Sequence, residues 1–332
     1  MTKTKNLISF VIPCYRSEAT ITQVIDEIIE VVGQRPQYSY EIICVNDCSP
    51  DNVYSVLVDL ARKNKNIKVV NFSKNMGKHA AVLAGYSYIS GEYVVNLDDD
   101  FQCPTTELWK LLDPLISDEC DYTTAKYSVK KESAWKRLGS KVNILMSSML
   151  LGKPKNIHFE NFTACKRFIA DEMAKYPNPY PYLEGLLLRV TRNIKEIPME
   201  ERDRADNNTT GYTFFKSISL WINGFTAFSV KPLRISTFVG MLTAVIGFVF
   251  GVYTVINKLL NPDIVLGYTT LAATQLFLSG LILMCLGMVG EYVGRIYICI
   301  NKAPQYVVKN TLNIDCPSSE DSVTAGSADV FK

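Results

Sequence analysis

Two long stretches without a charged side chain constrain the fold of this chain more than any other feature. Residues 235–257 and 264–290 contain no Asp, Glu, Lys or Arg. Each stretch is at least as long as the roughly 20 apolar residues that an α-helix needs to cross the hydrocarbon core of a bilayer. A core helix of a soluble protein is rarely so long and so free of charge. We therefore expect two transmembrane helices, at about 235–257 and 267–290, within a membrane segment of residues 233–300.

The charges around these stretches predict their orientation. Cytoplasmic loops carry an excess of Lys and Arg, so we expect an integral, multi-pass protein of the cell (inner) membrane with both termini in the cytosol. Residues 212–232 are rich in aromatic side chains, as in an interfacial amphipathic helix. Residues 301–332 have the composition of a polar cytosolic tail, without fixed structure from Asn310 onward. Four basic residues flank the outer ends of the two stretches: Lys231, Arg234, Arg295 and Lys302.

Residues 1–211 alternate short apolar runs with segments of helical spacing. This alternation predicts an α/β fold with a doubly wound, mostly parallel sheet, in which ligands bind at the carboxyl ends of the strands. We assign the whole range to one cytosolic domain. Strands are expected at residues 7–13, 41–46, 67–72 and 93–97, and helices at residues 20–32, 53–61 and 77–89.

The overall composition argues against several functions. The formal net charge is +2, so bulk charge gives no reason to expect a nucleic acid as partner. No GxGxxG sequence follows the first expected strand, which argues against a dinucleotide-dependent oxidoreductase. The nine cysteines are scattered without CxxC spacing, and the chain has two histidines. A zinc site is therefore not expected, whereas reduced thiols are.

Three consecutive carboxylates, Asp98, Asp99 and Asp100, follow the expected strand at 93–97. They would repel one another, and each would be costly to desolvate alone. A divalent cation removes both problems, and carboxylate oxygens suit Mg²⁺ or Mn²⁺. Strand alternation would place Asp98 and Asp100 on one face, with Gln102 next if the backbone stays extended. The alternative is a solvated acidic turn that caps the following helix.

Four segments resemble, in order, the motifs of family 2 glycosyltransferases of the GT-A fold. They are residues 11–18 (VIPCYRSE), 45–51 (VNDCSPD), 75–81 (NMGKHAA) and 97–102 (LDDDFQ). The resemblance implies a GT-A catalytic domain that binds a nucleotide sugar, for which a UDP-sugar is expected. The residues implied for the nucleotide sugar are Pro13, Tyr15, Glu18, Asp47, Lys78 and Asp98, and those implied for the Mg²⁺ or Mn²⁺ ion are Asp98, Asp100 and Gln102.

Two later segments resemble the polyprenyl-phosphate branch of that family, which includes enzymes like dolichol-phosphate mannose synthase and bactoprenol glucosyltransferase. These segments are residues 200–216 and 290–306. Asn208 and Thr210 replace the usual Gly and Ser, and Ala303 stands where an Arg is usual. A basic stretch around Lys131 is either a solvated helix face or a cationic lid over a phosphate. The residues expected to bind the lipid phosphate are Arg202, Arg204, Thr210, Tyr212, Lys216 and Lys131.

The segment at 159–167 departs from the family pattern. Asn161 stands where related enzymes often carry an Asp, which argues against an aspartate general base. A phosphomonoester acceptor has a second pKa of roughly 6 and is largely dianionic at neutral pH, so it needs positioning more than deprotonation. Glu160 remains a candidate for contacts to the sugar. The expected catalytic residues are Asp98, Asp100, Glu160 and Arg202.

The resemblance implies an inverting glycosyltransferase that moves one sugar from a nucleotide sugar to polyprenyl (undecaprenyl) phosphate at the cytosolic face of the membrane. The product would serve modification of cell-envelope glycans. The implied partners are the nucleotide sugar, the polyprenyl phosphate and the lipid bilayer, with a homo-oligomer and a downstream flippase as further candidates. One alternative is a processive polysaccharide synthase, whose usual Gln-x-x-Arg-Trp sequence the chain lacks. Another is an inactive membrane binding partner, against which the intact Asp98-x-Asp100 argues.

Overall fold

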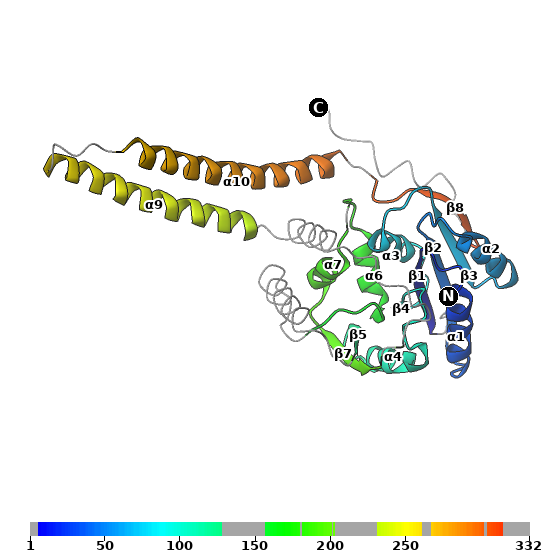
Figure 1. Ribbon diagram of the computed structural model, residues 1–332. Helices are drawn as coiled ribbons and strands as arrows, with labels where there is room; N and C mark the ends of the chain where they lie inside the picture. The colour runs from blue at the N-terminus through cyan, green and yellow to red at the C-terminus, as the bar shows by residue number, and fades with distance from the viewer. Residues whose placement is uncertain are drawn as a thin grey trace, which may run out of the picture. The chain divides into compact units, whose positions relative to one another are not determined.

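The computed structural model describes residues 6–127, 157–179, 181–200, 202, 231–260, 267–301 and 304–314. Predictions for other residues lie outside the described part, as does the interfacial helix expected at 212–232 except for its last two residues. The chain divides into two compact units (Figure 1). The α/β unit comprises Met1–Leu138, Pro154–Thr209 and Pro304–Lys332, and the helical unit comprises Gly139–Lys153 and Thr210–Ala303.

The α/β unit is built on one eight-stranded sheet with the order β7-β5-β6-β4-β1-β2-β3-β8. β1, β2, β3 and β4 run parallel to one another, whereas β6 and β8 run against their neighbours. The mostly parallel α/β sheet predicted from the sequence is therefore confirmed. The strands are β1 (Leu7–Cys14), β2 (Ser39–Asn46), β3 (Ile67–Phe72), β4 (Tyr93–Asn96), β5 (Tyr122–Tyr127), β6 (Thr163–Lys166), β7 (Ile194–Met199) and β8 (Val308–Leu312).

Helices cover this sheet because their apolar residues recur at helical spacing. In α1, Ile21, Val24, Ile25 and Ile28 are all buried and form the apolar stripe of an amphipathic helix. They pack in one core with strand residues such as Phe10. The helices of the unit are α1 (Ile21–Gly33), α2 (Val53–Lys63), α3 (Lys78–Tyr86), the short 3-10 helix η1 (Thr105–Glu107), α4 (Leu108–Ile116), α6 (Arg167–Ala174) and α7 (Leu183–Val190).

The last strand was not expected from the sequence. Residues from Asn310 onward were predicted to lack structure, but β8 extends to Leu312 and pairs antiparallel with β3. The pairing sets Val69 opposite Leu312 and Asn71 opposite Asn310. The prediction of a structureless tail is thus wrong for its first residues, because backbone pairing along the free edge of β3 can order a polar segment.

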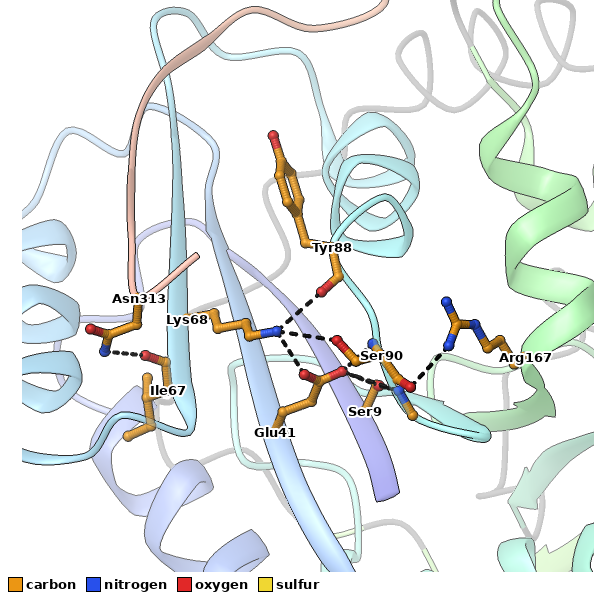
Figure 2. Close-up of polar contacts among 9 residues, drawn as sticks. Ser9, Glu41, Ile67, Lys68, Tyr88, Ser90, Arg167 and Asn313 are labelled. Atoms are coloured by element: carbon orange, nitrogen blue, oxygen red, sulfur yellow. Dashed lines mark hydrogen bonds and ion pairs between the residues drawn. The ribbon is translucent and has the colours of Figure 1, made fainter. Parts of the chain in front are cut away.

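A buried ion pair ties three strands to the loop between α3 and β4. Figure 2 shows Glu41 and Lys68 pointing toward each other from neighbouring strands, with Lys68 Nζ 2.7 Å from Glu41 Oε2. Glu41 Oε1 also accepts hydrogen bonds from Ser9 Oγ (2.5 Å), from the amide of Ser90 and from the amide of Gly91 (3.3 Å). Burial opposes ionisation of Glu41, but the hydrogen bonds from Lys68, Ser9 and Ser90 outweigh it and lower its pKa.

The helical unit contains two long helices, α9 (Lys231–Leu260) and α10 (Tyr268–Ile300). Ser236 Oγ lies 3.0 Å from Cys285 Sγ, so the two helices contact each other. By length and composition, Ser236–Tyr253 and Phe277–Ile300 could each cross a membrane. Large apolar side chains point outward along both helices, for example Phe248 with 74% and Phe277 with 68% of its surface exposed.

Candidate active site

Polar loops follow four parallel strands and meet at one edge of the sheet. Tyr15 follows β1, Asp47 follows β2, the loop at 75–77 follows β3, and Asp98 follows β4. Carboxyl ends of parallel strands form the usual ligand-binding edge of such sheets. The sequence-predicted residues on these loops are therefore brought together by the topology alone.

Asp47 holds the loop that follows β3. Its carboxylate accepts hydrogen bonds from the amides of Met76 (Oδ1, 2.6 Å) and Gly77 (Oδ2, 2.8 Å). Its carbonyl oxygen accepts a third from Asn75 Nδ2 at 3.2 Å. Burial raises the pKa of Asp47, and the two amide hydrogen bonds partly offset that rise. The amides of Met76 and Gly77 are thus engaged by a carboxylate of the chain itself.

Gly77 allows this loop to turn into α3. Its φ of +87° lies in the region that side chains disfavour, and a Cβ there would meet nothing within 4 Å. The need for glycine is therefore conformational rather than steric. The turn lets two successive amides point at Asp47 while Lys78 starts the helix.

Asp98 carries the first carboxylate of the acidic loop and is paired with Lys78. Lys78 Nζ lies 2.5 Å from Asp98 Oδ1, and the lysine side chain is 41% exposed. Because the pair is open to solvent, it contributes little stability and can exchange partners. The ammonium of Lys78 beside Asp98 shows that this carboxylate attracts a positive charge.

Asp99 contacts the loop after β1 and the residue that precedes α1. Its Oδ2 accepts a hydrogen bond from the amide of Tyr15 at 2.8 Å, and its carbonyl oxygen accepts one from Thr20 Oγ1 at 2.5 Å. Burial raises the pKa of Asp99 to about 6. The middle carboxylate therefore links the acidic loop to the Tyr15 loop.

The sequence analysis based the positions of Asp98, Asp100 and Gln102 on alternation along an extended strand, and that basis was wrong. β4 ends at Asn96, so the acidic residues lie on a loop and not on an extended strand. Phe101 has a φ of +64°, and the amide of Gln102 turns back to donate to Asp100 Oδ1 at 3.2 Å. Gln102 thus follows a turn, and strand alternation does not decide where its side chain points.

The other residues expected around the nucleotide lie on or beside the loop after β1. Pro13 is a buried residue within β1 itself. Tyr15 is 43% exposed at the sheet edge, a position that suits stacking on a base. Glu18 Oε2 accepts a hydrogen bond from the amide of Asn52 at 3.2 Å and so ties this loop to the start of α2.

Arg202 lies beside the acidic loop but its guanidinium is already paired. It contacts Glu27 through two bonds, of 2.8 and 2.6 Å, and stands 4.8 Å from the centre of the Phe101 ring. Its amide donates to the carbonyl of Gln102 at 3.2 Å. The hydrogen bonds that Arg202 donates to Glu27 raise the pKa of Arg202. To bind a lipid phosphate, Arg202 would have to leave Glu27.

Glu160 belongs to the segment that enters β6, and its amide donates to Thr124 Oγ1 at 3.1 Å. Thr20, which donates to Asp99, and Glu27, which pairs with Arg202, were not singled out from the sequence. The predicted lipid-phosphate residues Arg204, Thr210, Tyr212, Lys216 and Lys131 lie outside the described residues.

Asp98 and Asp100 are the residues best suited to hold a metal ion. No group of three or more His, Cys, Asp or Glu side chains within the described ranges could hold a metal ion unaided. Mg²⁺ sites that act on nucleotides are commonly built from one or two carboxylates together with substrate phosphates. The carboxylate oxygens of the acidic loop fit such a shared site. Asp98 already pairs with a positive group, the ammonium of Lys78.

The fold is a mostly parallel α/β sheet with polar loops at the carboxyl ends of its strands, and comparison with known proteins identifies its family. Residues 9–172 match Glycosyl transferase family 2, and residues 231–296 match the GtrB C-terminal hairpin. A putative glycosyltransferase of Bacillus subtilis, CsbB, is 30% identical over 326 residues, which cover 96% of each chain. The chain belongs to glycosyl transferase family 2.

Two further comparisons concern a named activity and a solved structure. A prophage-derived bactoprenol glucosyl transferase of Shigella flexneri is 28% identical over 315 residues, covering 92% of this chain and 98% of the relative. Glucosyl-3-phosphoglycerate synthase from Mycobacterium tuberculosis, solved with Mn²⁺ and UDP-glucose, matches with a TM-score of 0.52 at 18% identity. That match covers 67% of this chain and 77% of the synthase, and it supports the fold.

Proposed function

We propose that this glycosyltransferase moves one sugar from a nucleoside-diphosphate sugar, preferably a UDP-sugar, to polyprenyl phosphate at the cytosolic face of a membrane. The meeting of the acidic loop, Lys78 and the Asp47 and Tyr15 loops at one sheet edge carries this proposal. The same chain carries a GtrB hairpin. The Shigella relative, named for bactoprenol, aligns with nearly the whole chain, which supports a polyprenyl acceptor.

The donor would bind across the loops that follow β1, β2 and β4. The exposed ring of Tyr15 is available to stack on the base. Asp47 fixes the loop after β3 and keeps unused lone pairs for the base or ribose. Lys78 would leave Asp98 and approach the diphosphate. Asp98 and Asp100, with Gln102 as a third candidate, would hold Mg²⁺ or Mn²⁺, which would neutralise charge on the leaving diphosphate.

The acceptor supplies its own nucleophile in this reaction. An oxygen of the lipid phosphate attacks the anomeric carbon, and the bond from that carbon to the diphosphate oxygen breaks. In-line attack inverts the anomeric configuration, and the nucleoside diphosphate leaves with the bonding electrons. Because the phosphate is largely dianionic at neutral pH, the departure of Asn161 from the family's Asp does not disable the step.

The apolar surfaces of α9 and α10 explain why such an enzyme would carry a hairpin. Contiguous apolar surface on a helix needs cover, and outward-pointing residues such as Phe238 and Leu286 are 67% and 62% exposed. A bilayer supplies that cover and also contains the polyprenyl acceptor. The basic residues at the outer ends of the helices favour a cytosolic catalytic domain, where nucleotide sugars are found.

The proposal can be tested with purified full-length protein in detergent or nanodiscs. Undecaprenyl phosphate and a panel of nucleotide sugars would be supplied with Mn²⁺ or Mg²⁺, and lipid-linked sugar would be followed by mass spectrometry. We expect one sugar per lipid with at least one donor, and loss of product when EDTA is added. Absence of lipid-linked product with every donor would refute the proposal, and a polymer would indicate a processive synthase instead.

Matched variants test the role of the acidic loop. Asp98→Asn and Asp100→Asn should each lower kcat/KM by roughly 100-fold or more, since they remove charge that acts on the leaving group. Asp59→Asn is the control, because Asp59 is 63% exposed in an ion pair with Arg62 on α2. Activity of Asp100→Ala equal to that of an active wild type would contradict a role for Asp100 in the reaction, whereas absence of activity in both would favour the inactive binding partner.

A further inference from the structure

The C-terminal residues 304–314, here called the C-terminal strap, cross the α/β unit and end as its edge strand. Gln305 Nε2 donates to the carbonyls of Asn178 (3.0 Å) and Tyr176 (3.4 Å). The ring of Tyr306 stacks on Phe72, with centroids 5.3 Å apart and planes within 6°. β8 then pairs along β3, at the edge of the sheet seen in Figure 1.

Asparagine side chains connect the strap to the interior of the sheet. Asn71 Nδ2 donates to Asn310 Oδ1 at 2.8 Å, and Asn46 Nδ2 donates to Asn71 Oδ1 at 2.8 Å. Asn310 Nδ2 donates to the hydroxyl of Tyr54. Asn46 and Asn71 are 3% and 7% exposed, so neither has water as an alternative partner of equal quality. Each amide depends on the next one to satisfy its polar atoms.

The inner end of this amide chain reaches the donor loops. Asn46 directly precedes Asp47, and its Oδ1 accepts a hydrogen bond from the amide of Ser49 at 3.2 Å. Ser49 Oγ in turn accepts one from the amide of Arg16 at 2.8 Å, beside Tyr15. A continuous path of hydrogen bonds therefore runs from β8, across β3 and β2, to the two loops assigned to the nucleotide.

We infer that Asn310 is a positioning residue for the donor site, acting through Asn71 and Asn46 to fix the loops after β1 and β2. The inference rests on the proposed function, because it concerns the nucleotide pocket. Asn310 itself does not touch the nucleotide. Without its carbonyl oxygen, Asn71 Nδ2 loses its acceptor, and Asn71 must turn away from Asn46 to find another. Asn46 then no longer accepts the hydrogen bond from the Ser49 amide. The loops after β1 and β2, which meet at Ser49 and Arg16, are then less firmly positioned.

Asn313 provides a matched control on the same strap. Its Nδ2 donates to the carbonyls of Ala61 (2.6 Å) and Ile67 (2.8 Å), the second of which is drawn in Figure 2. Neither contact leads to the donor loops. Asn313 has a φ of +56°, so Asn313→Gly removes the side chain without backbone strain. A strap that only stabilises the fold would make both positions equivalent.

The test uses full-length protein in detergent with Mn²⁺, titrated with UDP and GDP by calorimetry, and donor KM and kcat from the transfer assay. Asn310→Leu should weaken binding of the preferred nucleotide and raise donor KM by roughly five- to tenfold, with kcat within about twofold. Asn310→Asp should stay within about twofold of wild type, because its carboxylate accepts from both Asn71 and Tyr54. Asn313→Gly should leave nucleotide affinity unchanged even where it lowers Tm.

Several outcomes would overturn the inference. These are unchanged nucleotide affinity in Asn310→Leu, an equal loss in Asn313→Gly, or a failure of Asn310→Asp to retain binding. If Asn310→Leu does not fold, Asn310→Ser is read by the same criteria, because its shorter side chain does not reach Asn71. Wild-type protein that binds neither nucleotide and transfers no sugar would refute the proposed function instead, so the two failures are distinguishable.

Discussion

Replacement of Glu41 by Gln tests how much the buried ion pair contributes to the α/β unit. The substitution keeps the shape of the side chain and an acceptor oxygen for Ser9 and the Ser90 amide. It removes the negative charge that faces Lys68. The lysine ammonium is then left half-buried without a counter-charge, next to an amide group that cannot neutralise it.

The size of the effect follows from the burial of the two partners. Removal of one partner from a buried pair costs roughly 3–5 kcal/mol. The side chains of Lys68 and Glu41 are 20% and 7% exposed, so water partly solvates the stranded ammonium. Glu41→Gln should therefore lower the free energy of unfolding by about 2–3 kcal/mol, which for a unit of this size lowers Tm by roughly 5–10 °C.

A double-mutant cycle tests whether the uncompensated charge of Lys68 causes the loss of stability in Glu41→Gln. Lys68→Met alone leaves Glu41 with its three hydroxyl and amide donors and should cost less than Glu41→Gln. The combination Glu41→Gln with Lys68→Met should be more stable than Glu41→Gln alone, with a coupling of about 1–3 kcal/mol. Thermal unfolding of full-length protein would be followed by intrinsic fluorescence, to which the buried Trp109 contributes.

The control and the pH dependence complete this test. Glu172→Gln removes a carboxylate that is 52% exposed in a surface pair with Lys175, and it should shift Tm by no more than about 2 °C. The pKa of Glu41 is lowered below 4.5 in the folded state, so its contribution is complete above pH 4.5 and lost as the pH falls through the folded pKa. The Tm gap between wild type and Glu41→Gln should therefore narrow below pH 4.5. Equal Tm values at pH 7, or purely additive effects in the cycle, would refute the reasoning.

Three further predictions concern the loops of the α/β unit. Gly91→Ala should lower Tm by roughly 4–10 °C, because its Cβ would lie 2.5 Å from the carbonyl oxygen of Leu7 and 2.8 Å from the Ser9 nitrogen; a thermal scan that matches wild type would contradict this. Gly77→Ala meets no atoms but must adopt a φ of +87°, so a cost of about 1–2 kcal/mol should appear together with a higher donor KM as the Asp47 contacts loosen. Glu27→Gln and Arg202→Ala should each weaken apparent Mn²⁺ affinity severalfold if Arg202 acts by holding the acidic loop; a Glu27→Gln enzyme with normal metal and lipid dependence would instead favour Arg202 as a phosphate ligand.

The first four strands could be predicted because they are buried runs of β-branched and aliphatic residues. Their bounds agree with the expected ones to within one or two residues at most ends, as in β3 at Ile67–Phe72. The location of the site followed from the same reasoning, since parallel strands deliver their carboxyl ends to one edge. Both inferences depend on local patterns that a sequence displays directly.

Other features depend on contacts between distant residues, which composition does not report. Arg202 was expected at a lipid phosphate, but its partner Glu27 lies 175 positions away. Asp47 was expected at the nucleotide and Asp99 was given no role, and nothing in the sequence around either indicated that loop amides would engage its carboxylate. The position of Gln102 was predicted from strand alternation, but β4 ends at Asn96 and the chain turns at Phe101, so that alternation does not apply.

β8 also sets an order of events during synthesis. Asn71 and Asn310, which pair across β3 and β8, are 239 positions apart, and the whole hairpin of α9 and α10 lies between them. Chains emerge from the ribosome N-terminus first, and contacts between distant segments form late. The edge of β3 thus stays open until the hairpin has been made. A nascent chain that stalls before Val308 has every catalytic loop of the sheet but lacks the strand that closes its edge.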